Sequence, residues 1–154
     1  MITIGIDPGS SGVICILEGS QVELLKLPYI ENKLDVAEVS ILLHDRKPNK
    51  IVIEKPFIMP GNKNKGLISQ LTNYGALWAV CEISGCTDVI EVMPRVWKKT
   101  LRLGSDKEDS INKAKELNPN INLKLTKRSK VDNHNAAEAY LLAYWATTIL
   151  KDQS

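Results

Sequence analysis

The sequence predicts an α/β fold in which one mixed sheet, three antiparallel strands plus two parallel ones, is flanked by helices. Three strand-like segments come first and are separated only by short turns. Two β-branched runs then alternate with helical segments, and a helical segment closes the chain. The 154 residues, 44% hydrophobic and 25% charged, suit a single globular domain spanning residues 1–154.

The N-terminal segments have the pattern of an antiparallel meander. Residues 2–7 alternate apolar with small or polar side chains and stop at a Pro-Gly-Ser-Ser-Gly turn, residues 8–12. Residues 13–17 and 22–27 are further strand-like runs, joined across a Glu-Gly-Ser turn. These three runs therefore predict the antiparallel half of the sheet.

The later elements follow from capping and periodicity signals. Asp35 and Glu38 have capping-box spacing and predict a helix that ends before Pro48. The β-branched run 51–53 predicts a buried strand that delivers Glu54 at its end. The other predicted elements are a helix over 67–83, a strand over 89–92, a short helix or turn over 95–103, a helix over 107–117, a basic loop over 122–130 and a final helix over 133–150.

Bulk charge does not indicate a partner, because 20 Lys and Arg against 18 Asp and Glu leave a net charge of only +2. The basic residues gather between the predicted elements, and such clusters form either a solvated surface or a rim that follows phosphates. They are Lys63 and Lys65; Arg95, Lys98, Lys99 and Arg102; and Lys124, Lys127, Arg128 and Lys130.

Cysteine spacing and hydropathy indicate an intracellular protein. The three cysteines have no metal-binding spacing, and we expect them to be reduced and structural. The sequence contains neither a secretory signal pattern nor an apolar run of about 20 residues. We therefore expect a cytoplasmic protein that does not contact membranes.

Carboxylates end two of the predicted strands. Asp7 closes the first strand and Glu54 closes the fourth, and parallel neighbours open at the same edge of a sheet. Glu138, near the start of the last helix, is a candidate third member. Such a cluster suits two Mg²⁺ ions about 4 Å apart, an arrangement that hydrolyses phosphodiesters. Taken singly, Asp7 is also explained as a turn cap and Glu54 as a surface carboxylate beside Lys55.

Four motifs occur in an order that is typical of a known family. Residues 4–9 read Ile-Gly-Ile-Asp-Pro-Gly, residues 52–57 read Val-Ile-Glu-Lys-Pro-Phe, and residues 136–139 read Ala-Ala-Glu-Ala. Gly-Ser at 104–105 precedes Lys107 at the start of a helix. In these motifs, nearly end to end, the sequence resembles the RuvC-type Holliday junction resolvases of the RNase H-like superfamily, in their phage-like branch.

The resemblance implies a metal-dependent endonuclease that nicks branched DNA, resolving four-way junctions by paired symmetric incisions and acting on forks and flaps as further candidate substrates. It implies two Mg²⁺ ions per site, with Mn²⁺ as a substitute, held by Asp7, Glu54 and Glu138. It also implies that Lys107 lies near the scissile phosphate and that Phe57 stacks on an unpaired base. Arg95 matches a phosphate-binding position, and Lys63 and Lys65 belong to the candidate DNA-binding rim.

The two-fold symmetry of a four-way junction implies a C2 homodimer, with the helix over 67–83 as the expected interface. The three tryptophans, by contrast, lie at helical spacing among apolar residues. We assign them to the core or to subunit contacts.

One position departs from the family pattern. Three residues before Glu138 the family has an acidic residue or sometimes a histidine, and this chain has Asn135, preceded by His134. Residues three and four apart share a helix face, so either side chain is a candidate catalytic residue beside Glu138, and Asn135 a candidate metal ligand. A natural variant, an engineered Asp-to-Asn change and a degenerate site are three open interpretations. Asp132 is the expected N-cap of this helix.

Two other functions remain open at this point. Asn135 is compatible with a catalytically silent module that binds junctions without cutting them. The Asp-Pro-Gly turn also occurs in actin-like ATPases, which bind phosphate through it. Those proteins need two such subdomains around a nucleotide, and 154 residues supply one.

Overall fold

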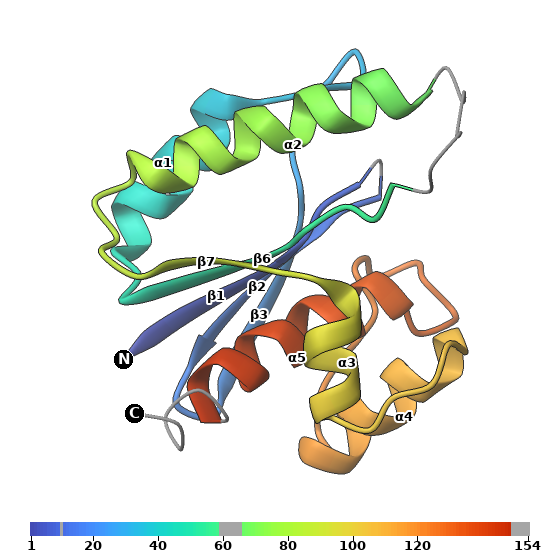
Figure 1. Ribbon diagram of the computed structural model, residues 1–154. Helices are drawn as coiled ribbons and strands as arrows, with labels where there is room; N and C mark the ends of the chain where they lie inside the picture. Colours follow the sequence, from blue (N-terminus) through green and yellow to red (C-terminus); the bar gives the residue numbers. More distant parts are fainter. Residues whose placement is uncertain (10, 59–65, 149–154) are drawn as a thin grey trace.

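A computed structural model describes residues 1–9, 11–58 and 66–148, and it has one central sheet between two layers of helices (Figure 1). The sheet order is β3-β2-β1-β6-β7. Its first three strands pair antiparallel, whereas β6 pairs parallel with both β1 and β7. The predicted fold class is therefore confirmed. The strands are β1 (Ile2–Asp7), β2 (Val13–Glu18), β3 (Gln21–Lys26), β6 (Lys50–Glu54) and β7 (Val89–Val92).

The helices divide between the two faces of the sheet (Figure 1). Helices α1 (Val36–Arg46) and α2 (Gly66–Glu82) share one buried cluster with Ile4, Ile6 and other residues of that face. The opposite face carries three helices whose buried residues form a second cluster with Val13, Cys15 and Val52. These are α3 (Pro94–Thr100), α4 (Lys107–Leu117) and α5 (His134–Thr148).

Helix α5 lies directly against β1, and small residues permit this approach. A Cβ at Gly5 would lie 2.2 Å from the carbonyl oxygen of Ala139 and 2.6 Å from the amide nitrogen of Ala143. Those distances are too short for any side chain, so only glycine fits here. The contact sets how far Glu138 on α5 lies from Asp7 at the end of β1.

A short antiparallel ribbon was not predicted from the sequence. It consists of β4 (Tyr29–Ile30) and β5 (Lys33–Leu34), joined through Glu31 and Asn32. Both linking residues have positive φ values, 48° and 64°, as a tight hairpin turn requires. Asn73 of α2 holds the ribbon: its Oδ1 accepts from the amide of Leu34 at 3.1 Å, and its Nδ2 donates to the carbonyl of Asn32 at 3.0 Å.

One predicted helix cap is confirmed and another is wrong. Asp35 accepts a hydrogen bond from the amide of Glu38 at 3.1 Å, as the capping-box spacing predicts. At α5, however, the side chain of Asn133 caps the helix by accepting from the amide of Ala136 at 3.0 Å. Asp132 pairs instead with Lys115 at 2.5 Å, because α4 packs beside this turn.

In the described part of the chain, no helix has the length and apolar character to span a membrane.

Candidate metal centre

Three carboxylates meet at the edge of the sheet where β1 and β6 end. One oxygen from each of Asp7, Glu54 and Glu138 lies within 4.8 Å of the others. The parallel register, which places Ile6 beside Ile53, brings the first two together, and α5 supplies the third. The structure thus gathers the same three carboxylates that the sequence singled out.

The three carboxylates have different hydrogen-bond partners. Glu54 accepts at Oε2 from the indole Nε1 of Trp97 at 2.7 Å. Glu138 accepts at Oε1 from the Lys98 ammonium at 2.7 Å and from the Ser110 hydroxyl at 3.0 Å. Among the hydrogen bonds of the described residues, none reaches the carboxylate of Asp7, which is only 9% exposed.

The three carboxylates of the cluster outnumber the positive charge that faces them. Burial raises the pKa of Asp7 well above its usual value, and the neighbouring Glu54 and Glu138 raise it further against the opposing effect of Lys98. Burial also raises the pKa of Glu54 to about 7, opposed by the Trp97 hydrogen bond and by Lys98. Among the described residues, the ammonium of Lys98 faces three carboxylates, and two of these, Asp7 and Glu54, resist ionisation.

A divalent cation fits this set of residues. Carboxylate oxygens are the ligands that Mg²⁺ and Mn²⁺ prefer. The carboxylate of Asp7 is buried and accepts no hydrogen bond from the described residues, so a cation would compensate its charge. The site can accordingly bind a hard metal ion.

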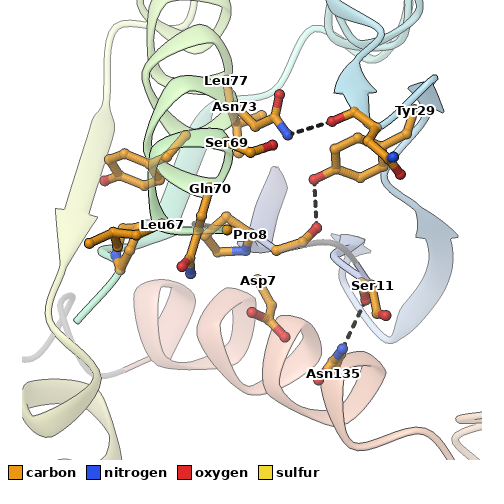
Figure 2. Close-up of a pocket in the computed structure, with 15 residues that line it drawn as sticks. Asp7, Pro8, Ser11, Tyr29, Leu67, Ser69, Gln70, Asn73, Leu77 and Asn135 are labelled. Carbon is orange, nitrogen blue, oxygen red and sulfur yellow. Dashed lines mark hydrogen bonds between the residues drawn. The ribbon is translucent and has the colours of Figure 1, made fainter. Parts of the chain in front are cut away.

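A cleft of about 650 Å³ opens beside Asp7 (Figure 2). It lies between the β1–β2 turn, the β4–β5 ribbon and the N-terminal half of α2. Tyr29 closes one side by donating its hydroxyl to the carbonyl of Gly9 at 2.5 Å. The polar lining is mostly uncharged. Among the described residues that line the cleft, Asp7 is the one carboxylic acid, and the other polar side chains are Ser11, Tyr29, Asn32, Ser69, Gln70, Asn73, Tyr74 and Asn135.

Asn135 lies in the same cleft, where its Nδ2 donates to the carbonyl of Ser11 at 2.8 Å (Figure 2). Its amide therefore ties α5 to the β1–β2 turn, and its Oδ1 accepts no hydrogen bond from the described residues. His134 is not a member of the acidic cluster within the described residues. Its pKa is lowered by partial burial and by Lys107, which favours the neutral imidazole.

The described residues that are predicted to contact DNA lie on the surface. Phe57 is 67% exposed, three residues after Glu54. Arg95 lies in the first turn of α3 and Lys107 begins α4; both are exposed, and neither forms an ion pair among the described residues. Lys63 and Lys65 lie outside the described part of the chain.

Sequence reasoning missed the groups that hold the carboxylates in place. Trp97 is in the core, as predicted, but its polar edge contacts Glu54. Lys98 was assigned to a basic surface cluster, whereas its ammonium pairs with Glu138. Ser110, which is buried, carried no sequence signal at all.

The mixed five-stranded sheet and its two helical layers form the RNase H-like fold. Among solved structures, the chain is similar to Thermus thermophilus RuvC, with a TM-score of 0.61, 18% sequence identity and 96% of each chain covered. It is also similar to T. thermophilus RuvC in complex with a Holliday junction substrate, with a TM-score of 0.57, 18% identity and the same coverage. No protein-family model and no curated protein sequence matches the chain. The chain therefore shares the RuvC fold over nearly its whole length.

Proposed function

We propose that this chain is a divalent-cation-dependent endonuclease that nicks branched DNA and resolves four-way junctions by paired incisions. The observation that carries the proposal is the cluster of Asp7, Glu54 and Glu138 at the ends of β1 and β6. The fold supports it, because the chain shares that fold with T. thermophilus RuvC, a protein that has been solved with a Holliday junction substrate.

Asp7, Glu54 and Glu138 would hold the metal. Bound Mg²⁺ supplies Lewis-acid stabilisation of the phosphoryl oxygens and lowers the pKa of an attacking water. The chain itself orients Glu138 through hydrogen bonds from Lys98 and Ser110. We propose two ions per site, with Mn²⁺ as a substitute for Mg²⁺, and calorimetric stoichiometry tests that number.

The DNA would approach across the exposed basic residues near the cluster. Lys107 lies close enough to His134 to lower its pKa, and His134 lies one helical turn before Glu138. An exposed ammonium at this place suits a phosphate beside the cut, and Arg95 suits a phosphate further along the strand. The exposed ring of Phe57 is free to stack on an unpaired base.

The deciding experiment compares labelled four-way junction, fork, flap and linear duplex, each with and without Mg²⁺ or Mn²⁺. We expect metal-dependent nicks at symmetric positions in two strands of the junction and little cutting of linear duplex. Junction binding without cleavage would favour the alternative of a catalytically silent module that binds junctions, with which Asn135 is compatible. Calorimetric binding of ATP, with no cleavage, would favour the actin-like alternative.

A further inference from the structure

Helix α3 supports two of the three carboxylates through adjacent residues. Trp97 is fully buried, and its Nε1 lies 2.7 Å from Oε2 of Glu54. Lys98 follows it and reaches Glu138 at 2.7 Å. Only Trp97 does so with a group that carries no charge and exchanges no proton with the site.

We propose that Trp97 is a positioning residue of the metal centre: its indole N–H holds the Glu54 carboxylate in the orientation that binds the cation. The inference rests on the proposed metal site. A carboxylate at the end of a strand can rotate about its side-chain bonds, and a hydrogen bond to one oxygen restricts both the position and the plane of the group. Groups that hydrogen-bond to metal ligands typically contribute about 10-fold to 100-fold to metal affinity.

The packing of Trp97 explains why an indole suits this role. The ring is part of the buried cluster beneath α5, so its core contacts set where the N–H lies. A longer polar side chain would have to be ordered on its own, at a cost in rotamer entropy. The neutral donor also leaves the negative charge of Glu54 available to the cation, whereas a second ammonium would compete with it.

The chain contains a matched control for this contact. Trp145 is also buried, 5% exposed, and its indole nitrogen has no hydrogen-bond partner in the described part of the chain. Trp97→Phe and Trp145→Phe therefore delete the same atoms from buried rings. Only the first deletion removes a donor to a carboxylate.

The test is a calorimetric titration of Mg²⁺ and of Mn²⁺ into the wild-type protein and both variants. We expect Trp97→Phe to weaken binding by about tenfold or more, and Trp145→Phe to stay within about twofold of wild type. Equal weakening in both variants, or none in Trp97→Phe, would overturn the inference while leaving the metal site intact. A wild-type protein that binds neither ion would overturn the inference and the proposed function together.

A second measurement uses the wild-type protein and does not depend on the stability of Trp97→Phe. The three tryptophans give three indole N–H signals in a ¹H–¹⁵N spectrum. Loss of a signal in Trp145→Phe and in Trp78→Phe assigns the third to Trp97. On addition of Mg²⁺ we expect the Trp97 signal to move and the Trp145 signal to stay. A Trp97 signal unchanged at saturating Mg²⁺ would refute the contact as part of the metal centre.

Discussion

Asp7 is the carboxylate of the site that receives no hydrogen bond from the described residues, whereas Glu54 and Glu138 each accept at least one. Its carboxylate is buried beside two others and has no hydrogen-bond donor in the described part of the chain. Its pKa is therefore higher in the folded chain than in the unfolded chain, mainly because of burial. Ionisation of Asp7 therefore lowers the free energy of unfolding. This loss of stability is absent at pH values below the pKa of Asp7 in the unfolded chain, and it is complete at pH values above its pKa in the folded chain.

Asp7→Asn should therefore stabilise the metal-free protein at neutral pH while abolishing metal binding and strand cleavage. The gain in the free energy of unfolding should be largest above the folded pKa of Asp7, where the cost of ionising this buried carboxyl is complete. Thermal melts in EDTA at several pH values check this, and the gain should shrink as the pH falls toward the unfolded pKa. Junction affinity should be largely kept. Cleavage within a few-fold of wild type would refute the placement of Asp7 in the metal site.

Glu54 should make metal affinity depend on pH. Its pKa is raised to about 7, chiefly by burial, so a proton competes with the metal below that pH. Because metal binding displaces that proton, Mg²⁺ affinity should fall about tenfold between pH 8 and pH 6. Calorimetry at the two pH values, in buffers of different ionisation enthalpy, measures both the affinity and the proton release. Equal affinities would contradict the assignment of Glu54 as a ligand.

Asn135 and His134 can be distinguished by substitution. Asn135→Asp adds an anionic oxygen to the cleft that Asp7 also lines, but it removes the donor to the carbonyl of Ser11. We expect stronger Mg²⁺ binding together with a metal-free stability lower by about 1 kcal/mol, the value of a typical hydrogen bond. If His134 fills the role instead, His134→Ala should remove most of the activity and Asn135→Asp should change it little. Parallel Mg²⁺ titrations on one junction substrate decide between them, and no effect from either variant would exclude a fourth ligand in this turn.

At the scale of elements, the contact between α5 and β1 controls the site. Gly5→Ala would place a Cβ 2.2 Å from the backbone of Ala139, next to Glu138, so the helix must move away from the strand. We expect a loss of about 1 to 3 kcal/mol in the free energy of unfolding, as in other overpacked cores. Metal affinity should fall as well, because the shift separates Glu138 from Asp7. Urea denaturation and calorimetry check the two effects, and unchanged metal affinity would show that Glu138 is positioned independently of this contact.

At the scale of the whole molecule, the outward side of α2 is the candidate dimer interface. Ile68 is 75% exposed and Leu71 38%, and Ile83, just beyond the helix, is 79% exposed. Exposed apolar side chains favour association when a partner covers them. A C2 dimer through α2 would present two metal sites in the relation that paired incisions need.

Ile68→Glu should therefore convert a dimer into a monomer that nicks one strand at a time. Sedimentation velocity measures the first effect. A supercoiled plasmid with an extruded cruciform measures the second, because paired cuts give linear DNA and single cuts give nicked circles. Ile41→Glu is the matched control, since Ile41 is 62% exposed but lies on α1. Equal linear product from the two variants would place the interface elsewhere.

The sequence alone determined the order of strands and helices and the meeting of Asp7 with Glu54. Both follow from local rules: side-chain periodicity identifies the elements, and parallel neighbouring strands end at the same edge of a sheet. The ribbon β4–β5 escaped prediction because its Glu-Asn turn is not a strong hairpin signal and its position depends on Asn73. The cap of α5 was assigned one residue early, since Asp132 and Asn133 are both suitable acceptors and only packing against α4 separates them.

Only the tertiary structure decided which groups hold the carboxylates. Trp97 and Glu54 are 43 residues apart, Lys98 and Glu138 are 40 apart, and Asn135 and Ser11 are 124 apart. Local sequence patterns do not predict such pairs, because a tryptophan among apolar residues is assigned to the core whether or not its N–H donates a hydrogen bond. The hydrogen bonds form only when α3 and α5 pack on the same face of the sheet, and that packing turns three separate acidic residues into one site.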